Sequence, residues 1–194
     1  MTRDSAAGAT FVDLVLAMAI TGILAGLSVP LVSRAVDAGR IRQAAGLVAS
    51  RFRLARAQAA SATRVVSVVF DRVDGRWVFE VCEDRNGNGI RRAEIQSGTD
   101  VCVDGPHDLA ALFPGVQVAA DASVPGPDGE SGSADPVRFG SANLASFSPA
   151  GTCSAGSLWL RSAGGSQFMV RVAGVTGRVR VLRYDAASGQ WRDG

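Results

Sequence analysis

The stretch AGATFVDLVLAMAITGILAGLSVP, residues 7–30, is a strongly apolar segment close to the start of the sequence. It has a carboxylate near its start, Asp13, and a proline at its end, Pro30, and no charged residue lies between Leu14 and Ser33. A helix of about 20 residues is roughly 30 Å long, which is the thickness of the hydrocarbon core of a bilayer. The stretch therefore predicts an apolar helix that lies in a membrane or packs against similar helices.

The residues after this stretch continue the helix on a different pattern. One apolar face recurs at alternating steps of four and three residues, formed by Ile41, Ala45, Val48, Phe52, Ala55 and Ala59. A secretory signal would have a shorter apolar core and a cleavage region after it. We therefore expect one helix from about Thr10 to about Ser61, apolar all round in its first half and amphipathic in its second.

The N-terminal spacing resembles that of type IV pilins and type II secretion pseudopilins. In that family a prepilin peptidase cuts after a glycine and methylates the new N-terminus, the fifth mature residue is acidic and the twenty-second is usually proline. Counted from Ala9, Asp13 is fifth and Pro30 is twenty-second. The resemblance implies cleavage after Gly8, an N-methylated Ala9, and assembly through Pro30 and through Asp13, which would pair with a neighbouring subunit's amine.

This sequence departs from the family pattern at three points. The first mature residue is Ala9 where phenylalanine is usual, and the acid is aspartate where glutamate is usual. The leader, MTRDSAAG, has one arginine and one aspartate and is less basic than expected. Aspartate keeps the charge on a shorter stem, so the departure affects the geometry of the pairing more than its chemistry.

Beyond Thr63 the apolar residues alternate or form short runs, which is typical of strands. The expected strands cover 65–70, 76–82, 137–139, 157–161, 168–172 and 178–184. We expect an α+β fold in which the long N-terminal helix packs on a small antiparallel sheet. The expected organisation is a leader (1–8), a transmembrane or filament-core helix (9–33), an amphipathic continuation (34–63) and a β-rich head (64–194).

Two further segments resemble the GspH/FimT branch of minor pilins and pseudopilins: EDRNGNGIRRAEI (83–95) and the closing run from SPAGTC to TGRVRV. In the first segment, Asp84, Asn86 and Asn88 match the opening positions of a calcium loop. The position of the bidentate glutamate holds Ile95, so the ligand set is incomplete. We expect a tight turn between strands, with weak calcium binding as the alternative.

The three cysteines, Cys82, Cys102 and Cys153, suit an exported protein with one disulfide or a chain with none. A Cys82–Cys102 bond would close the intervening loop and is favoured over three unpaired cysteines.

The single histidine, His107, is expected in a surface loop without an acid partner. No catalytic or cofactor motif is present, so we expect neither an enzyme nor a cofactor.

The C-terminal part is rich in arginine, with six arginines and two aspartates over 161–194. In Gly177-Arg178-Val179-Arg180 the two arginines are two residues apart, which on a strand puts them on one face about 6.6–7 Å apart. That spacing is comparable with the spacing of successive phosphates. Arg171 and Arg183 could extend the patch. The motif is similar to the GRxR element with which the FimT branch captures DNA. The alternatives are a solvated strand face, or arginines that pair with the acidic middle region of the chain.

Together these features predict a minor type IV pilin that binds extracellular DNA through non-specific backbone contacts for DNA uptake. The alternative is a minor pseudopilin of a type II secretion system. Either would be held in the inner membrane by one span, with its head outside the cytoplasm, before joining a pilus or pseudopilus. The expected partners are other pilins or pseudopilins, the prepilin peptidase, the membrane and DNA.

Overall fold

The computed structural model describes residues 10–194, without the side chains of residues 25–31. The predicted leader, 1–8, and the predicted cleavage site at Gly8 and Ala9 lie outside the described residues. The chain divides into two compact units, one ending at Val36 and the other covering Asp37–Gly194. One helix, α1 (Phe11–Ala62), contains the boundary between these units.

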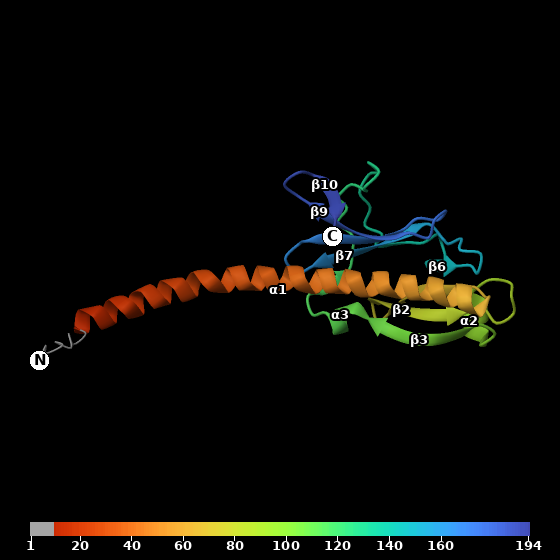
Figure 1. Ribbon diagram of the computed structural model, residues 1–194, viewed down its shortest axis with the longest axis horizontal. Helices are drawn as coiled ribbons and strands as arrows, with labels where there is room; N and C mark the ends of the chain where they lie inside the picture. Colours follow the sequence, from red (N-terminus) through yellow and green to blue (C-terminus); the bar gives the residue numbers. More distant parts are fainter. Residues whose placement is uncertain (1–9) are drawn as a thin grey trace, which may run out of the picture. The chain divides into compact units, whose positions relative to one another are not determined.

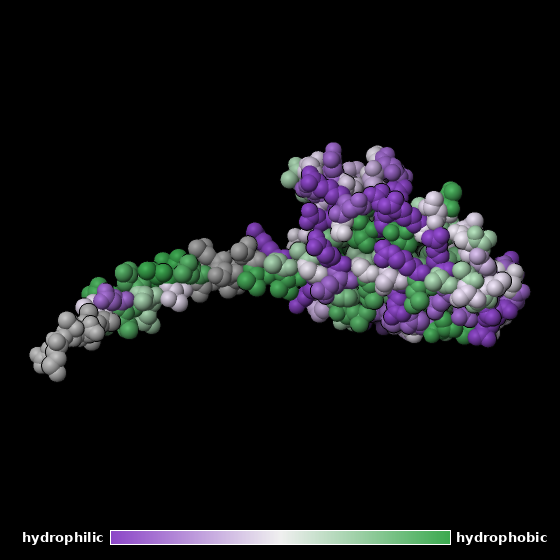
Figure 2. Space-filling model, viewed as in Figure 1, coloured by the Kyte–Doolittle hydropathy of each residue, from purple (hydrophilic) through white to green (hydrophobic). Residues whose placement is uncertain are grey.

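The described part of the first unit is an apolar helical segment with one polar end. Its large apolar side chains are exposed, Phe11 and Val12 most of all (80% and 71%). Figure 2 shows hydrophobic residues along the part of α1 that is red in Figure 1. At the start of the helix, the Thr10 N–H and hydroxyl both donate to Asp13 Oδ2, at 2.9 and 2.7 Å. Pro30 lies within α1. Among the described residues, no helix has both the length and the hydropathy of a membrane span.

In the second unit, α1 contributes one face to the main core. The six apolar residues spaced by four and three are each at most 1% exposed. Phe52 is central to this core, because its ring contacts those of Phe70, Phe139 and Phe147 at centroid distances of 6.2, 5.5 and 6.2 Å. Burying such a face stabilises the helix far more than intrinsic propensity does.

The remaining elements alternate strands with two short helices (Figure 1). They are β1 (Val66–Val73), β2 (Arg76–Glu83), α2 (Arg92–Ser97), β3 (Val101–Asp108), α3 (Leu109–Leu112), β4 (Val116–Val118), β5 (Val137–Arg138), β6 (Leu144–Phe147), β7 (Gly156–Ser162), β8 (Gln167–Val172), β9 (Val179–Asp185) and β10 (Gln190–Asp193). One sheet has the order β3-β2-β1-β6. The other has the order β10-β9-β8-β7-β4, with β5 also paired to β7.

The predicted fold class, a long helix on one small antiparallel sheet, is wrong: the described strands form two sheets, of four and six strands. The prediction missed β3, β4, β6 and β10. These strands are short or carry glycine, proline and charged residues, so they lack the apolar alternation that indicates a strand. Because β6 covers the edge of β1, and β7 pairs with β8 and with β4, the later strands build a separate sheet.

The second sheet carries buried apolar residues on both faces. Its inner face joins the main core through Phe168, Val170 and Val172. Its outer face carries a second cluster in which Trp159, Met169 and Leu182 are buried, with Trp191 packed against them. The Trp191 ring meets the Trp159 ring edge-on at 5.1 Å. This outer cluster fixes β9 and β10, which carry three of the six arginines of residues 161–194.

Candidate nucleic-acid interface

The Gly177–Arg180 motif begins in the turn between β8 and β9. Within the turn the Gly177 N–H donates to the Ala173 carbonyl at 2.8 Å, and the Ala173 N–H donates to the Arg178 carbonyl at 3.0 Å. Gly177 has φ +63°, a left-handed conformation that favours glycine. A side chain there would place its Cβ 2.9 Å from Arg56 Cζ. The turn therefore favours glycine directly before Arg178.

Three of the predicted arginines surround one cleft. Arg171 on β8 lies opposite Arg180 on β9 in the antiparallel register, so both point to the same face of the sheet. Arg178 completes the set, and the cleft of about 630 Å³ is also lined by the segment Pro125–Gly129 and by Trp191. In Figure 2 hydrophilic residues gather over β9 and β10. The sheet register thus brings together residues that are seven and nine positions apart in sequence.

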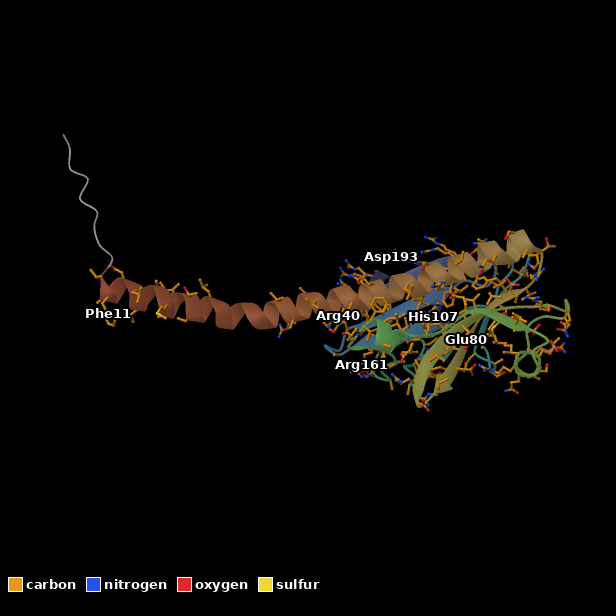
Figure 3. The ribbon with its side chains drawn as sticks, turned by 90° about the horizontal axis from the view of Figure 1, so that it is seen from below. Phe11, Arg40, Glu80, His107, Arg161 and Asp193 are labelled. Atoms are coloured by element: carbon orange, nitrogen blue, oxygen red, sulfur yellow. A yellow bond between two sulfur atoms is a disulfide. The ribbon has the colours of Figure 1, made fainter. Side chains whose placement is uncertain are left out.

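Acidic residues neutralise part of this cleft. Arg180 forms an ion pair with Asp193 at 2.8 Å, on the last strand (Figure 3), and Arg171 pairs with Asp128. The Arg171 hydrogen bond lowers the pKa of Asp128 below its ordinary value. Arg178 has no ion-pair partner among the described residues. Exposed pairs of this kind are worth little in water, so a phosphate can replace the carboxylate at small cost.

Arg183 does not join this group. Strand alternation puts it on the face opposite to Arg180, and its register neighbours are Phe168 and Arg192. It is not among the residues that line the cleft. The idea that Arg183 extends the patch is therefore wrong, because it lies an odd number of residues from both Arg178 and Arg180.

Two arginines of α1 lie beside the motif, and no sequence pattern indicated this. Arg53 donates to the Val179 carbonyl at 3.5 Å, and Arg56 donates to the Gly177 carbonyl at 3.3 Å. More than a hundred residues separate these partners in sequence, so local periodicity could not connect them. The available signal was weaker: both arginines lie off the apolar face of the helix.

The segment that resembles a calcium loop is held together by its own hydrogen bonds. The buried Asp84 carboxylate accepts from the N–H groups of Asn86, Gly87 and Gly89 at 3.2, 2.7 and 2.7 Å. The side-chain amides of Asn86 and Asn88 donate to Glu94 at 3.3 and 2.8 Å. The carboxylates therefore stabilise the loop, and their oxygens are already used by protein donors.

A second carboxylate, the buried Asp100, accepts from the N–H groups of Arg85 and Arg91, both at 3.3 Å. Within the described part of the chain, the grouping with metal-ligand geometry is Glu80, Cys82 and Cys102. Two of these three form a disulfide, Cys82–Cys102, between β2 and β3. Their sulfur atoms are therefore not available as thiolate ligands.

Cys153 is the unbonded cysteine, and burial raises the pKa of its thiol, which disfavours the reactive thiolate.

His107 lies on β3 (Figure 3), where the sequence indicated a loop. Its Nε2 is 2.8 Å from Asp104 Oδ1, and Asp104 also pairs with Arg51 of α1. The expectation that His107 has no acid partner is wrong. These three groups link β3 to the helix.

No family model, curated protein or solved structure matches this chain. A function must therefore be inferred from the spacing of the N-terminal residues and from the arginine surface itself.

Proposed function

We propose that this chain is a minor type IV pilin that binds DNA through backbone phosphates at Arg171, Arg178 and Arg180. The observation that supports DNA binding best is the convergence of these three arginines on one cleft. Guanidinium groups are permanently charged, planar donors that match phosphate oxygens. Because such contacts reach the backbone and not the base edges, binding should depend little on DNA sequence.

The pilin part of the proposal is supported by the spacing of Gly8, Asp13 and Pro30. An apolar helix with exposed side chains is stable in lipid before assembly and among other helices after it. Head-to-tail contacts between such helices do not close and so build a fibre. Asp13, hydrogen-bonded to Thr10 in the single chain, would exchange this partner for the N-terminal amine of a neighbouring subunit.

The first experiment measures DNA binding by the full-length protein in neutral detergent. Anisotropy of a labelled duplex at several salt concentrations compares the wild type with Arg178→Gln/Arg180→Gln. If each arginine neutralises one phosphate, the log–log salt slope should flatten by about 1.8 in the double variant. The matched control, Arg85→Gln/Arg91→Gln, removes the same charge from the 84–91 segment and should leave the slope unchanged. Equal slopes in all three proteins would refute the DNA interface.

Processing is tested separately. Co-expression with a prepilin peptidase should shorten the wild type by the eight residues of the leader, whereas Gly8→Val should stay uncut. Mass spectrometry reads both the cut and the methyl group on Ala9. Normal cleavage of the Gly8 variant, or none of the wild type, would remove the pilin assignment whatever the DNA result.

A type II secretion pseudopilin is the second candidate, and one observation favours it. Arg171 and Arg180 already have partners in Asp128 and Asp193, as expected if the cleft only stabilises the head. Such a protein would be processed in the same way but would not bind DNA. Processing without salt-dependent DNA binding would therefore move the assignment to the pseudopilin.

A further inference from the structure

Three arginines line a groove of about 470 Å³ beside the DNA-binding cleft. Arg53 and Arg56 come from α1 and Arg178 comes from the β8–β9 turn, with Ala57 and Ala60 between them. Nine other arginines form ion pairs: Arg51, Arg64, Arg76, Arg91, Arg92, Arg161, Arg171, Arg180 and Arg192. Within the described residues, none of the three groove arginines does. The groove therefore concentrates positive charge that the protein itself leaves uncompensated.

The two helix arginines are held in place by the motif segment. They are three residues apart on α1, so their side chains leave the same side of the helix. Arg53 donates to the Val179 carbonyl and Arg56 to the Gly177 carbonyl, at 3.5 and 3.3 Å. A guanidinium has five N–H donors, so each keeps donors for a ligand after making its carbonyl contact.

Gly177 favours this arrangement. Its lack of a side chain lets Arg56 lie over the turn, since a Cβ would come within 2.9 Å of Arg56 Cζ. The same glycine provides the left-handed turn that precedes Arg178. One residue thus positions both the strand arginine and the helix arginine.

We propose that this groove binds a phosphate group and that a nucleic-acid strand supplies it. The identity of the strand rests on the proposed function; the phosphate chemistry rests on the three arginines. Arg178 lines both the groove and the cleft that contains Arg171 and Arg180. A strand can therefore pass from one to the other and contact five arginines in place of three.

The groove is tested first with inorganic pyrophosphate, without DNA. In amide NMR spectra of the full-length protein in neutral detergent, pyrophosphate should shift the Gly177 and Val179 resonances of the wild type at low salt. Arg53→Gln/Arg56→Gln should lose these shifts, and Arg85→Gln/Arg91→Gln should keep them. If the wild type shows no such shifts, or if the Arg53→Gln/Arg56→Gln variant keeps them, the proposal that the groove binds phosphate is wrong.

The source of the phosphate is tested with labelled DNA. The Arg53→Gln/Arg56→Gln variant should flatten the salt slope by up to about 1.8, and Arg53→Lys/Arg56→Lys, which keeps the charge and guards against misfolding, should restore most of it. If the Arg53→Gln/Arg56→Gln variant keeps the wild-type salt slope, the proposal that the groove binds nucleic acid is wrong. The proposed DNA contact at the cleft of Arg171, Arg178 and Arg180 is not affected by that result. If the wild type binds pyrophosphate but not DNA, the proposed function fails and the phosphate groove stands.

Discussion

Two charged regions of this protein use their charge in opposite ways. In the 84–100 segment, buried carboxylates are surrounded by donors: Asp84 is 3% exposed and accepts three backbone N–H groups. Around the Gly177–Arg180 motif, exposed guanidinium groups donate to carbonyls, form weak surface pairs or have no acid partner among the described residues. Charge that stabilises a fold is buried and satisfied, whereas charge available to a ligand is exposed and incompletely paired.

The largest loss of stability is expected from a substitution of Asp84. Asp84→Ala removes the buried carboxylate that accepts three backbone N–H groups, so it should lower the free energy of unfolding by about 2–3 kcal/mol. Arg178→Ala removes an exposed side chain and should change the free energy of unfolding by less than about 0.5 kcal/mol. Urea titrations of both variants give the two values.

If Asp84→Ala and Arg178→Ala lower the free energy of unfolding equally, the distinction between charge that stabilises the fold and charge available to a ligand is wrong. Asp84→Asn is the useful control, because it keeps one acceptor oxygen and should lie between the wild type and Asp84→Ala. Addition of millimolar calcium during the same titrations tests the alternative role of the segment. Stabilisation of the wild type by calcium, lost in Asp84→Asn, would assign the carboxylate to an ion.

A smaller effect is expected from the acids that compete with a ligand. Asp128→Asn/Asp193→Asn frees Arg171 and Arg180, and each surface pair is worth at most about 1 kcal/mol. If both pairs are lost, DNA affinity at low salt should therefore rise by up to roughly thirtyfold, with little change in stability. Asp71→Asn/Asp74→Asn changes the net charge equally at the β1–β2 hairpin. An equal gain in that control would show a general charge effect instead of a local one.

The sequence predicted some of these features and not others, for physical reasons. The buried face of α1 follows from its spacing, because Ile41 to Ala59 must share one side of a helix. The face of Arg183 was also predictable, since strand alternation separates it from Arg180. The pairing of Arg171 with Arg180 depends on the length of the β8–β9 turn, and the approach of Arg56 to Gly177 depends on tertiary packing. No local pattern encodes those two contacts.

The smallest expected effect is a change in the pKa of Asp128 when its partner Arg171 is removed. The Arg171 hydrogen bond lowers the pKa of Asp128 from its ordinary value of 3.8, so the ionised pair is present above that pH and is lost as the pH falls through the lowered value. Carboxyl NMR should therefore find Asp128 titrating below 3.8 in the wild type and close to 3.8 in Arg171→Gln. Between pH 7 and 5 the pair stays closed, so acidification over that range should not release Arg171 to DNA. A wild-type Asp128 that titrates normally would mean that the pair does not persist in water, and Arg171 would then be as available to a phosphate as Arg178.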